Sequence, residues 1–158
     1  MTLKLTTILS IATIVLLTSC GKGEIDFNNT LVENQKEVLA KYNAFITKQS
    51  ENEDVPADST LIEAKSIITL LNIKIKEVNA LNIPKGGEQL HKSFLKEFEF
   101  MRSYIDHYII VADSTKTASE VDAANTWLGA HSDDITTIEN ELIEAQKQFA
   151  KDKNFKIQ

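Results

Sequence analysis

Apolar side chains recur at spacings of three and four residues along most of the chain, and this pattern restricts the fold more than any other feature of the sequence. Its longest series runs without a slip between residues 121 and 149. The series consists of Val121, Ala124, Leu128, His131, Ile135, Ile138, Leu142, Ala145 and Phe149. Residues at this spacing share one face of an α-helix, and a period near 3.5 is typical of helices that pack side by side at about 20°. We therefore predict a long helix here.

Three earlier stretches follow the same rule, and we predict helices over residues 31–50, 60–82 and 87–112. In chain order, the faces predicted to be buried consist of Leu31, Gln35, Val38, Leu39, Tyr42, Phe45 and Ile46, then Leu61, Ala64, Ile68, Leu71, Ile75 and Val78, then Leu90, Phe94, Phe98, Met101, Ile105, Tyr108 and Ala112. Short connections make successive helices antiparallel neighbours. Two prolines and five glycines leave little material for a β-rich fold. The sequence predicts an all-α fold, an up-down-up-down antiparallel four-helix bundle.

Three Thr-x-x-Glu motifs mark predicted helix starts. In such a capping box the Thr hydroxyl accepts a hydrogen bond from a free backbone N–H, and the Glu carboxylate accepts one from the N–H of the Thr. The motifs are Thr30 with Glu33, Thr60 with Glu63, and Thr117 with Glu120. A fourth start is predicted between Pro84 and Glu88, because Pro84 ends the preceding helix and Gly86-Gly87 allows a turn.

The fourth predicted helix, residues 118–151, is longer than the others. At 1.5 Å per residue it would span about 51 Å, against about 30 to 38 Å for its neighbours. Either it overhangs the bundle or it breaks. The natural break is at Gly129 and the cluster Ser132-Asp133-Asp134, since Ser132 or Asp133 would cap a second segment.

The N-terminus has the pattern of a secretion signal. Lys4 precedes an apolar and hydroxyl run over residues 5–17, which is shorter than the roughly 20 helical residues that span a bilayer but is typical of a signal-peptide core. The run ends in Leu17-Thr18-Ser19-Cys20, which resembles the lipobox of bacterial lipoproteins. In a lipobox the cysteine thiol receives a diacylglyceryl group, the chain is cut before the cysteine, and the new N-terminus is acylated.

By that resemblance Cys20 is the lipid attachment site and the first residue of the mature protein. Two or three acyl chains, such as palmitate, hold a protein on a membrane essentially permanently. We divide the chain into a cleaved signal peptide at residues 1–19, a lipidated cysteine and flexible tether at 20–29, and a bundle domain at 30–158. Gly21 stands where inner-membrane lipoproteins of enterobacteria carry Asp, which favours the outer membrane of the cell envelope. The sequence leaves the periplasmic and the surface face open.

The charge of the chain argues against a nucleic-acid partner. The formal net charge is -6, and the lysines are interleaved with acidic residues and asparagines. The chain has a single cysteine, so an intramolecular disulfide is excluded.

Several short motifs resemble the small bacterial surface-lipoprotein family first recognised in Leptospira, here in a Bacteroidota-like type. They are Phe27-Asn28-Asn29 with Leu31-Val32 and Gln35, the Gly86 turn, and the tail Ala145-Gln146-Lys147-Gln148-Phe149-Ala150-Lys151. The resemblance covers most of the mature chain. It implies a helical envelope or surface lipoprotein of unassigned function, and it carries over no catalytic residue.

The histidines are the residues with chemistry to offer. Glu88 and His91 have the Glu-x-x-His spacing of di-iron bundles, but neither His107 nor His131 has a Glu three residues before it, so a Glu and a His at the surface or the rim of the bundle are the plainer interpretation. His131 occupies an otherwise apolar series. It is interpreted as a core histidine, with a polar pocket as the alternative. Antiparallel pairing places it beside about residue 98. We predict no cofactor, no metal site and no enzymatic activity.

An outward strip is predicted on the second helix. Taking about 100° per residue, Ile62, Leu70 and Ile73 fall at roughly 100°, 180° and 120° from Leu61, away from the core face. The strip is interpreted as a contact surface for a protein partner or a second copy. Scattered surface aliphatics, or burial beneath the 51–59 connection, are the alternatives.

Together these features predict a lipid-anchored envelope lipoprotein that is a non-enzymatic binding or structural module, attached to the membrane through Cys20. The alternative is a small-molecule or metal carrier with its site in the bundle near His131.

Overall fold

The computed structural model describes residues 22–51 and 55–155, and within them it contains α-helices and no strand. The helices are α1 (Lys22–Glu51), α2 (Ala57–Asn79), α3 (Glu88–Ala112), α4 (Ala118–Ala130) and α5 (Asp134–Asp152). The prediction of an all-α fold is confirmed for this part of the chain. Five helices appear in place of four because the predicted fourth helix is divided into α4 and α5.

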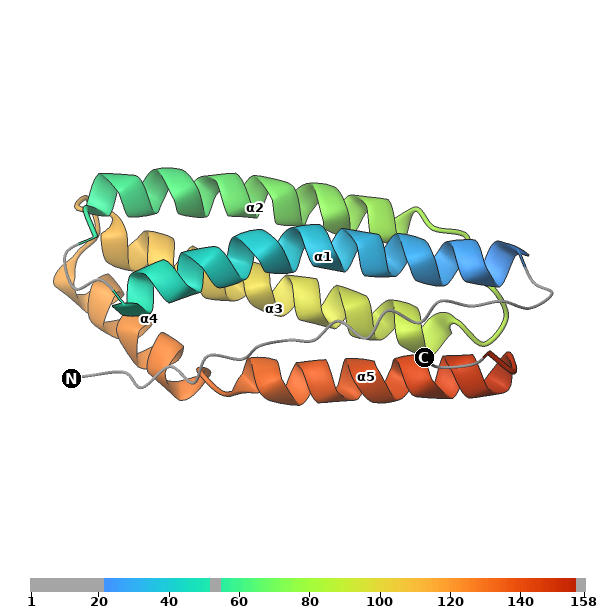
Figure 1. The fold of residues 1–158 in the computed structure, drawn as a ribbon. Helices are drawn as coiled ribbons and strands as arrows, with labels where there is room; N and C mark the ends of the chain where they lie inside the picture. The colour runs from blue at the N-terminus through green and yellow to red at the C-terminus, as the bar shows by residue number, and fades with distance from the viewer. Residues whose placement is uncertain (1–21, 52–54, 156–158) are drawn as a thin grey trace.

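The central helix is α3, which contacts each of the other four. Figure 1 shows α1, α2, α3 and α5 lying roughly along one long axis, with the short α4 set at an angle to it. Helix α2 packs against α1 and α3, whereas α4 and α5 pack against α3. The other four helices are therefore arranged around α3, and α1 also packs against α2.

The faces predicted from the 3,4 spacing form the core. On α1 and α3 the predicted residues are buried, except that Ile46, Tyr108 and Ala112 are partly buried. On α2 only Ala64, Leu71 and Val78 of the six predicted residues are buried, whereas Leu61, Ile68 and Ile75 are partly buried. The buried face also includes Ile67 and Leu70, because α2 packs against two helices instead of one.

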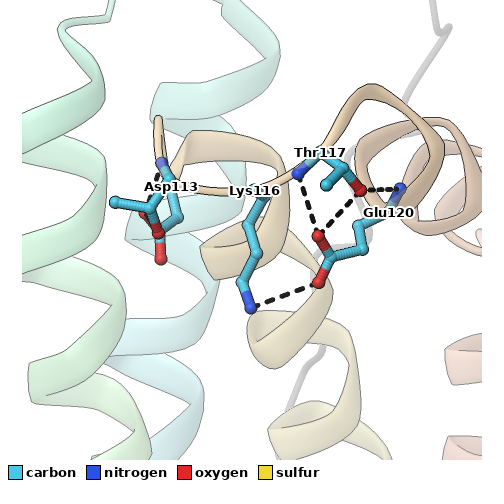
Figure 2. Close-up of polar contacts among 5 residues, drawn as sticks. Asp113, Lys116, Thr117 and Glu120 are labelled. Atoms are coloured by element: carbon cyan, nitrogen blue, oxygen red, sulfur yellow. Dashed lines mark hydrogen bonds and ion pairs between the residues drawn. The ribbon is translucent and has the colours of Figure 1, made fainter.

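One of the three predicted capping boxes is present. Thr117 Oγ1 accepts from the backbone N–H of Glu120 at 3.3 Å, and Glu120 Oε2 accepts from the backbone N–H of Thr117 at 2.9 Å (Figure 2). Figure 2 also shows Lys116 Nζ approaching the other Glu120 oxygen, at 3.4 Å. Helix α4 thus begins where the sequence predicts.

The predictions of the other two capping boxes were wrong, because Thr30 and Thr60 both lie inside helices. Thr30 Oγ1 donates to the Asp26 carbonyl one turn earlier, at 2.8 Å. Thr60 is a buried residue in the first turn of α2, and the helix begins after Pro56. A threonine hydroxyl within a helix can donate to a backbone carbonyl four residues earlier, so the Thr-x-x-Glu pattern does not by itself locate a helix start.

The prediction that residues 20–29 form a flexible tether was wrong for the described part of that segment. Helix α1 begins at Lys22, and Phe27 on its second turn is 3% exposed. The Phe27 ring lies edge to face with that of Phe149 on α5, with ring centroids 5.9 Å apart. Burial of one large aromatic side chain offsets the helix-weakening glycine at position 23.

The break in the fourth predicted helix lies where the sequence indicated. Helix α4 ends at Ala130 and α5 begins at Asp134. Ser132 Oγ donates to the Gly129 carbonyl at 3.3 Å, and Asp133 is the N-cap residue of α5. The Asp133 side chain makes no capping hydrogen bond, so that detail of the prediction was wrong.

Three chain segments meet at one end of the bundle, which we call the α1-start end. They are the start of α1, the turn between α2 and α3, and the end of α5 (Figure 1). Glu24 Oε1 lies 3.3 Å from Lys153 Nζ, which joins α1 to the end of α5. In the turn, Gly86 has a φ of 85°, a left-handed conformation that favours glycine. A Cβ added at Gly87 would lie 3.1 Å from the Phe27 ring, so this turn packs closely on α1.

Candidate functional site

The polar group most deeply buried in the bundle is the carboxyl of Glu97, on α3. Its side chain is fully buried, and Gln35 of α1 lies against it. Gln35 Nε2 donates to both carboxyl oxygens, at 3.0 and 2.9 Å. This pair joins α1 to α3 at the centre of the core, 62 residues apart in the sequence.

Burial raises the pKa of Glu97 to about 8. Removal from water is the largest cause, the nearby negative charge of Glu139 on α5 raises the pKa further, and the hydrogen bond from Gln35 opposes both. At neutral pH the carboxyl therefore holds its proton, and a neutral acid in hydrogen-bond contact with an amide avoids the large penalty of a buried charge.

Glu97 was not among the site residues predicted from the sequence, although its spacing from other core residues contains a signal. Leu90, Phe94, Glu97 and Met101 follow one another at intervals of four, three and four. Residues at these intervals share one face of the helix, so an acidic residue in an otherwise apolar series is expected to be buried with its neighbours. Phe98, one residue later, also fits the core face and was predicted there instead.

A second group of polar and aromatic side chains lies where α3 meets α4. The imidazole of His107 stacks on the Trp127 indole with ring centroids 3.9 Å apart and planes within 6°. His131 stacks on the same indole at 4.2 Å and 15°. Two near-parallel rings this close to one indole occupy its two faces. Tyr104 and Phe100 border the indole at 6.0 and 6.3 Å between centroids.

Backbone carbonyls fix how both stacked histidines are oriented. His107 Nδ1 lies 2.7 Å from the Ser103 carbonyl oxygen, and His131 Nδ1 lies 2.8 Å from that of Trp127. Because a carbonyl oxygen only accepts, each Nδ1 carries the proton. With the indole between them, the two rings cannot ligate one ion together.

His131 lies elsewhere than predicted. It is the C-cap residue of α4, is partly buried, and stands next to the indole that covers His107 instead of near residue 98. The reason is the break between α4 and α5, which lets α4 leave the bundle axis. Among residues 22–51 and 55–155, no three His, Cys, Asp or Glu side chains are grouped so as to hold a metal ion.

The predicted surface pair of Glu88 and His91 is only half correct. Glu88 is exposed, but His91 is 8% exposed, and its Nε2 donates to the Val78 carbonyl at the end of α2, at 2.9 Å. His91 ties the start of α3 to the end of α2.

The predicted outward strip of α2 loses one of its three members. Leu70 is 9% exposed and belongs to the core, because α2 packs against both α1 and α3, so its place in the strip was wrong. Ile62 and Ile73 are 73% and 48% exposed and lie on one outward face, three turns apart. That they contact a partner stays a prediction.

The predicted lipid attachment site, Cys20, lies outside the described residues. Helix α1 begins two residues after it. None of the described helices combines the length and apolar character needed to cross a membrane.

No protein-family model, curated protein or solved structure matches this chain. The resemblance to the surface-lipoprotein family therefore stays a prediction, and only the chain's own residues indicate a function.

Proposed function

We propose that this protein is a lipid-anchored helical module of the cell envelope, attached through Cys20 to the outer membrane and acting by contact instead of catalysis. The observation that carries the proposal is the N-terminal series of Lys4, the apolar run over residues 5–17, and Leu17-Thr18-Ser19-Cys20. A helical domain that starts immediately after the cysteine needs no membrane-spanning helix, because the acyl chains supply the anchor.

In the same proposal, α4 and α5 together serve as one broken fourth helix of an up-down-up-down bundle. Both pack against α3, and the segment between them, residues 131–133, is too short for a separate excursion. Such a bundle is a rigid body, suited to holding a surface at a defined distance from the membrane.

The histidines support a role without catalysis. The chain has three, and each donates a ring N–H to a backbone carbonyl: His91 to Val78, His107 to Ser103, and His131 to Trp127. These bonds explain the three side chains as structural residues. The fully buried Glu97 is likewise explained by its contact with Gln35.

Partition of the protein between water and Triton X-114 tests the anchoring. The wild type, expressed with its signal peptide, should enter the detergent phase, and Cys20→Ala should stay in the aqueous phase with an unchanged helical circular-dichroism spectrum. Ala40→Ser, at an exposed position of α1, is a control that leaves the whole Leu17-Thr18-Ser19-Cys20 motif intact. A processed Cys20→Ala variant that still enters the detergent phase contradicts the proposal.

The contact role rests on Ile62 and Ile73. Replacing Ile73 by Glu should remove a partner or a second copy, as seen by pull-down from native membranes or by light scattering, while the melting temperature holds. Ala40→Glu, at an exposed position of α1, is the control for added charge. If the lipid-free wild type is monomeric and Ile73→Glu loses no partner, this surface has no contact role.

A further inference from the structure

The α1-start end of the bundle differs in charge from the opposite end. At the opposite end, acidic residues outnumber basic ones over the last turn of α1, the first turns of α2 and the stretch from the end of α3 to the start of α5, taken together. The acidic residues there are Glu51, Asp58, Glu63, Asp106, Asp113, Glu120, Asp122, Asp133 and Asp134, against Lys48, Lys65, Arg102 and Lys116. At the α1-start end the numbers of acidic and basic residues are nearly equal. The net charge of -6 is therefore concentrated away from the start of α1.

Two lysines at the α1-start end are free to meet an anionic surface. Lys85 lies in the turn between α2 and α3, and Lys151 lies in the last turn of α5. Both side chains are exposed, and neither forms an ion pair with another described residue. Lys153, by contrast, is held by Glu24.

The same turn carries an exposed apolar side chain. Ile83 is 37% exposed, and it lies in the non-helical stretch between Asn79 and Glu88, next to Pro84 and two residues before Lys85. An exposed aliphatic side chain beside a lysine fits the boundary between lipid headgroups and acyl chains. The close packing of Gly87 against Phe27 fixes this turn beside the start of α1.

The position of the cysteine identifies what lies against this end. Two residues span at most about 7 Å, so an acyl group on Cys20 enters the bilayer close to the N-terminus of α1. The turn that carries Ile83 and Lys85 is at the same end (Figure 1).

We infer that the α1-start end is a lipid-contact surface, in which Ile83 enters the headgroup region and Lys85 and Lys151 meet anionic headgroups. This inference rests on the proposed lipid anchor at Cys20. This lipid contact holds the long axis of the bundle roughly perpendicular to the membrane. The acidic end and the stack of His107, Trp127 and His131 then lie farthest from the membrane. Repulsion between the acidic end and anionic lipid acts in the same direction.

The test uses the lipidated full chain in vesicles that contain anionic lipid, with a fluorescent label at a single introduced thiol. Because the chain's one cysteine is blocked by lipid, Ile83→Cys and Ile62→Cys each give one labelling site, and both positions are exposed. A nitroxide on the lipid headgroups should quench most of the fluorescence at position 83 and almost none at position 62.

The charge contribution is tested with Lys85→Glu combined with Lys151→Glu. Quenching at position 83 should fall on anionic vesicles, whereas Lys65→Glu with Lys116→Glu, the same charge change at the other end, should not lower it. Equal quenching at positions 83 and 62 in protein that floats with the vesicles overturns this inference alone. Protein that does not float with the vesicles overturns the anchor and this inference together.

Discussion

Phe27, on the second turn of α1, and Phe149, near the end of α5, pack edge to face with ring centroids 5.9 Å apart. This contact joins the first and the last described helices, and Phe155 extends it at 6.1 Å from Phe149. It makes the segment directly after the predicted lipid site part of the folded core. An anchor at Cys20, as proposed, would therefore be joined to the bundle without a flexible spacer among the described residues.

Replacing Phe27 by Ala should lower the free energy of unfolding by about 3 to 5 kcal/mol, the usual range for a large aromatic side chain removed from a core. Urea denaturation followed by circular dichroism measures the loss. Asp26→Ala, at an exposed neighbouring position, should change stability by less than about 0.5 kcal/mol. A loss below about 1 kcal/mol for Phe27→Ala would mean that residues 22–29 are a tether after all.

Glu97 should make stability depend on pH in the direction opposite to most carboxyls. Its pKa is about 8 in the folded protein and near 4.5 in the unfolded chain. Between these values the folded state keeps a proton that the unfolded state has lost. The free energy of unfolding therefore falls as pH rises, by at most about 1.4 kcal/mol per pH unit, and this contribution is complete only below the unfolded pKa.

Glu97→Gln removes that titration and keeps a side chain that can bond Gln35. The stability of the variant relative to wild type should rise as pH increases from about 5 to about 8 and then level off. Denaturant unfolding at a series of pH values measures the difference. Glu99→Gln, at an exposed position of the same helix, is the control and should run parallel to wild type. A parallel curve for Glu97→Gln would show that the buried carboxyl does not titrate in this range.

Two threonines in identical motifs should respond differently to substitution. Thr117→Ala removes a cap acceptor and should cost about 1 kcal/mol. Thr30→Ala removes only a bond to a carbonyl inside α1, and because alanine favours helix it should be neutral within about 0.5 kcal/mol. Thermal melting of both variants decides this, and equal losses would contradict the assigned helix starts.

Trp127 is the only tryptophan, so its emission reports on the stack between α3 and α4 alone. His107→Ala exposes one face of the indole to water and should shift the emission to longer wavelength. His131→Ala should do the same from the other face. His91 lies at the start of α3 and bonds the end of α2 instead of contacting the indole, so His91→Gln should leave the spectrum unchanged. Unaltered emission in both stack variants would rule out the stacked arrangement in solution.

Helix positions and core faces were predictable because apolar residues recur in the local sequence at intervals of three and four, close to the 3.6-residue period of a helix. The core face of α1, from Leu31 to Phe45, is one example. The break at residues 131–133 was also readable, since Gly129 and the Ser-Asp-Asp cluster favour a cap over a continuing helix.

What the sequence did not reveal depends on contacts between distant residues. Nothing near Phe27 indicates that Phe149 buries it, so the composition of residues 21–24 suggested a tether. Leu70 was placed outside because one core face was assumed for α2, which in fact packs against two helices. The stack at Trp127 follows from the direction in which α4 leaves the bundle axis.

The central claim is that Cys20 carries the anchor, and the intact mass of the mature protein purified from membranes tests it most directly. The predicted result is a chain that begins at Cys20 and is heavier than its amino-acid sequence by a diacylglyceryl group, with a further acyl chain on the N-terminus. An unmodified chain, or one that begins at another residue, would contradict the account.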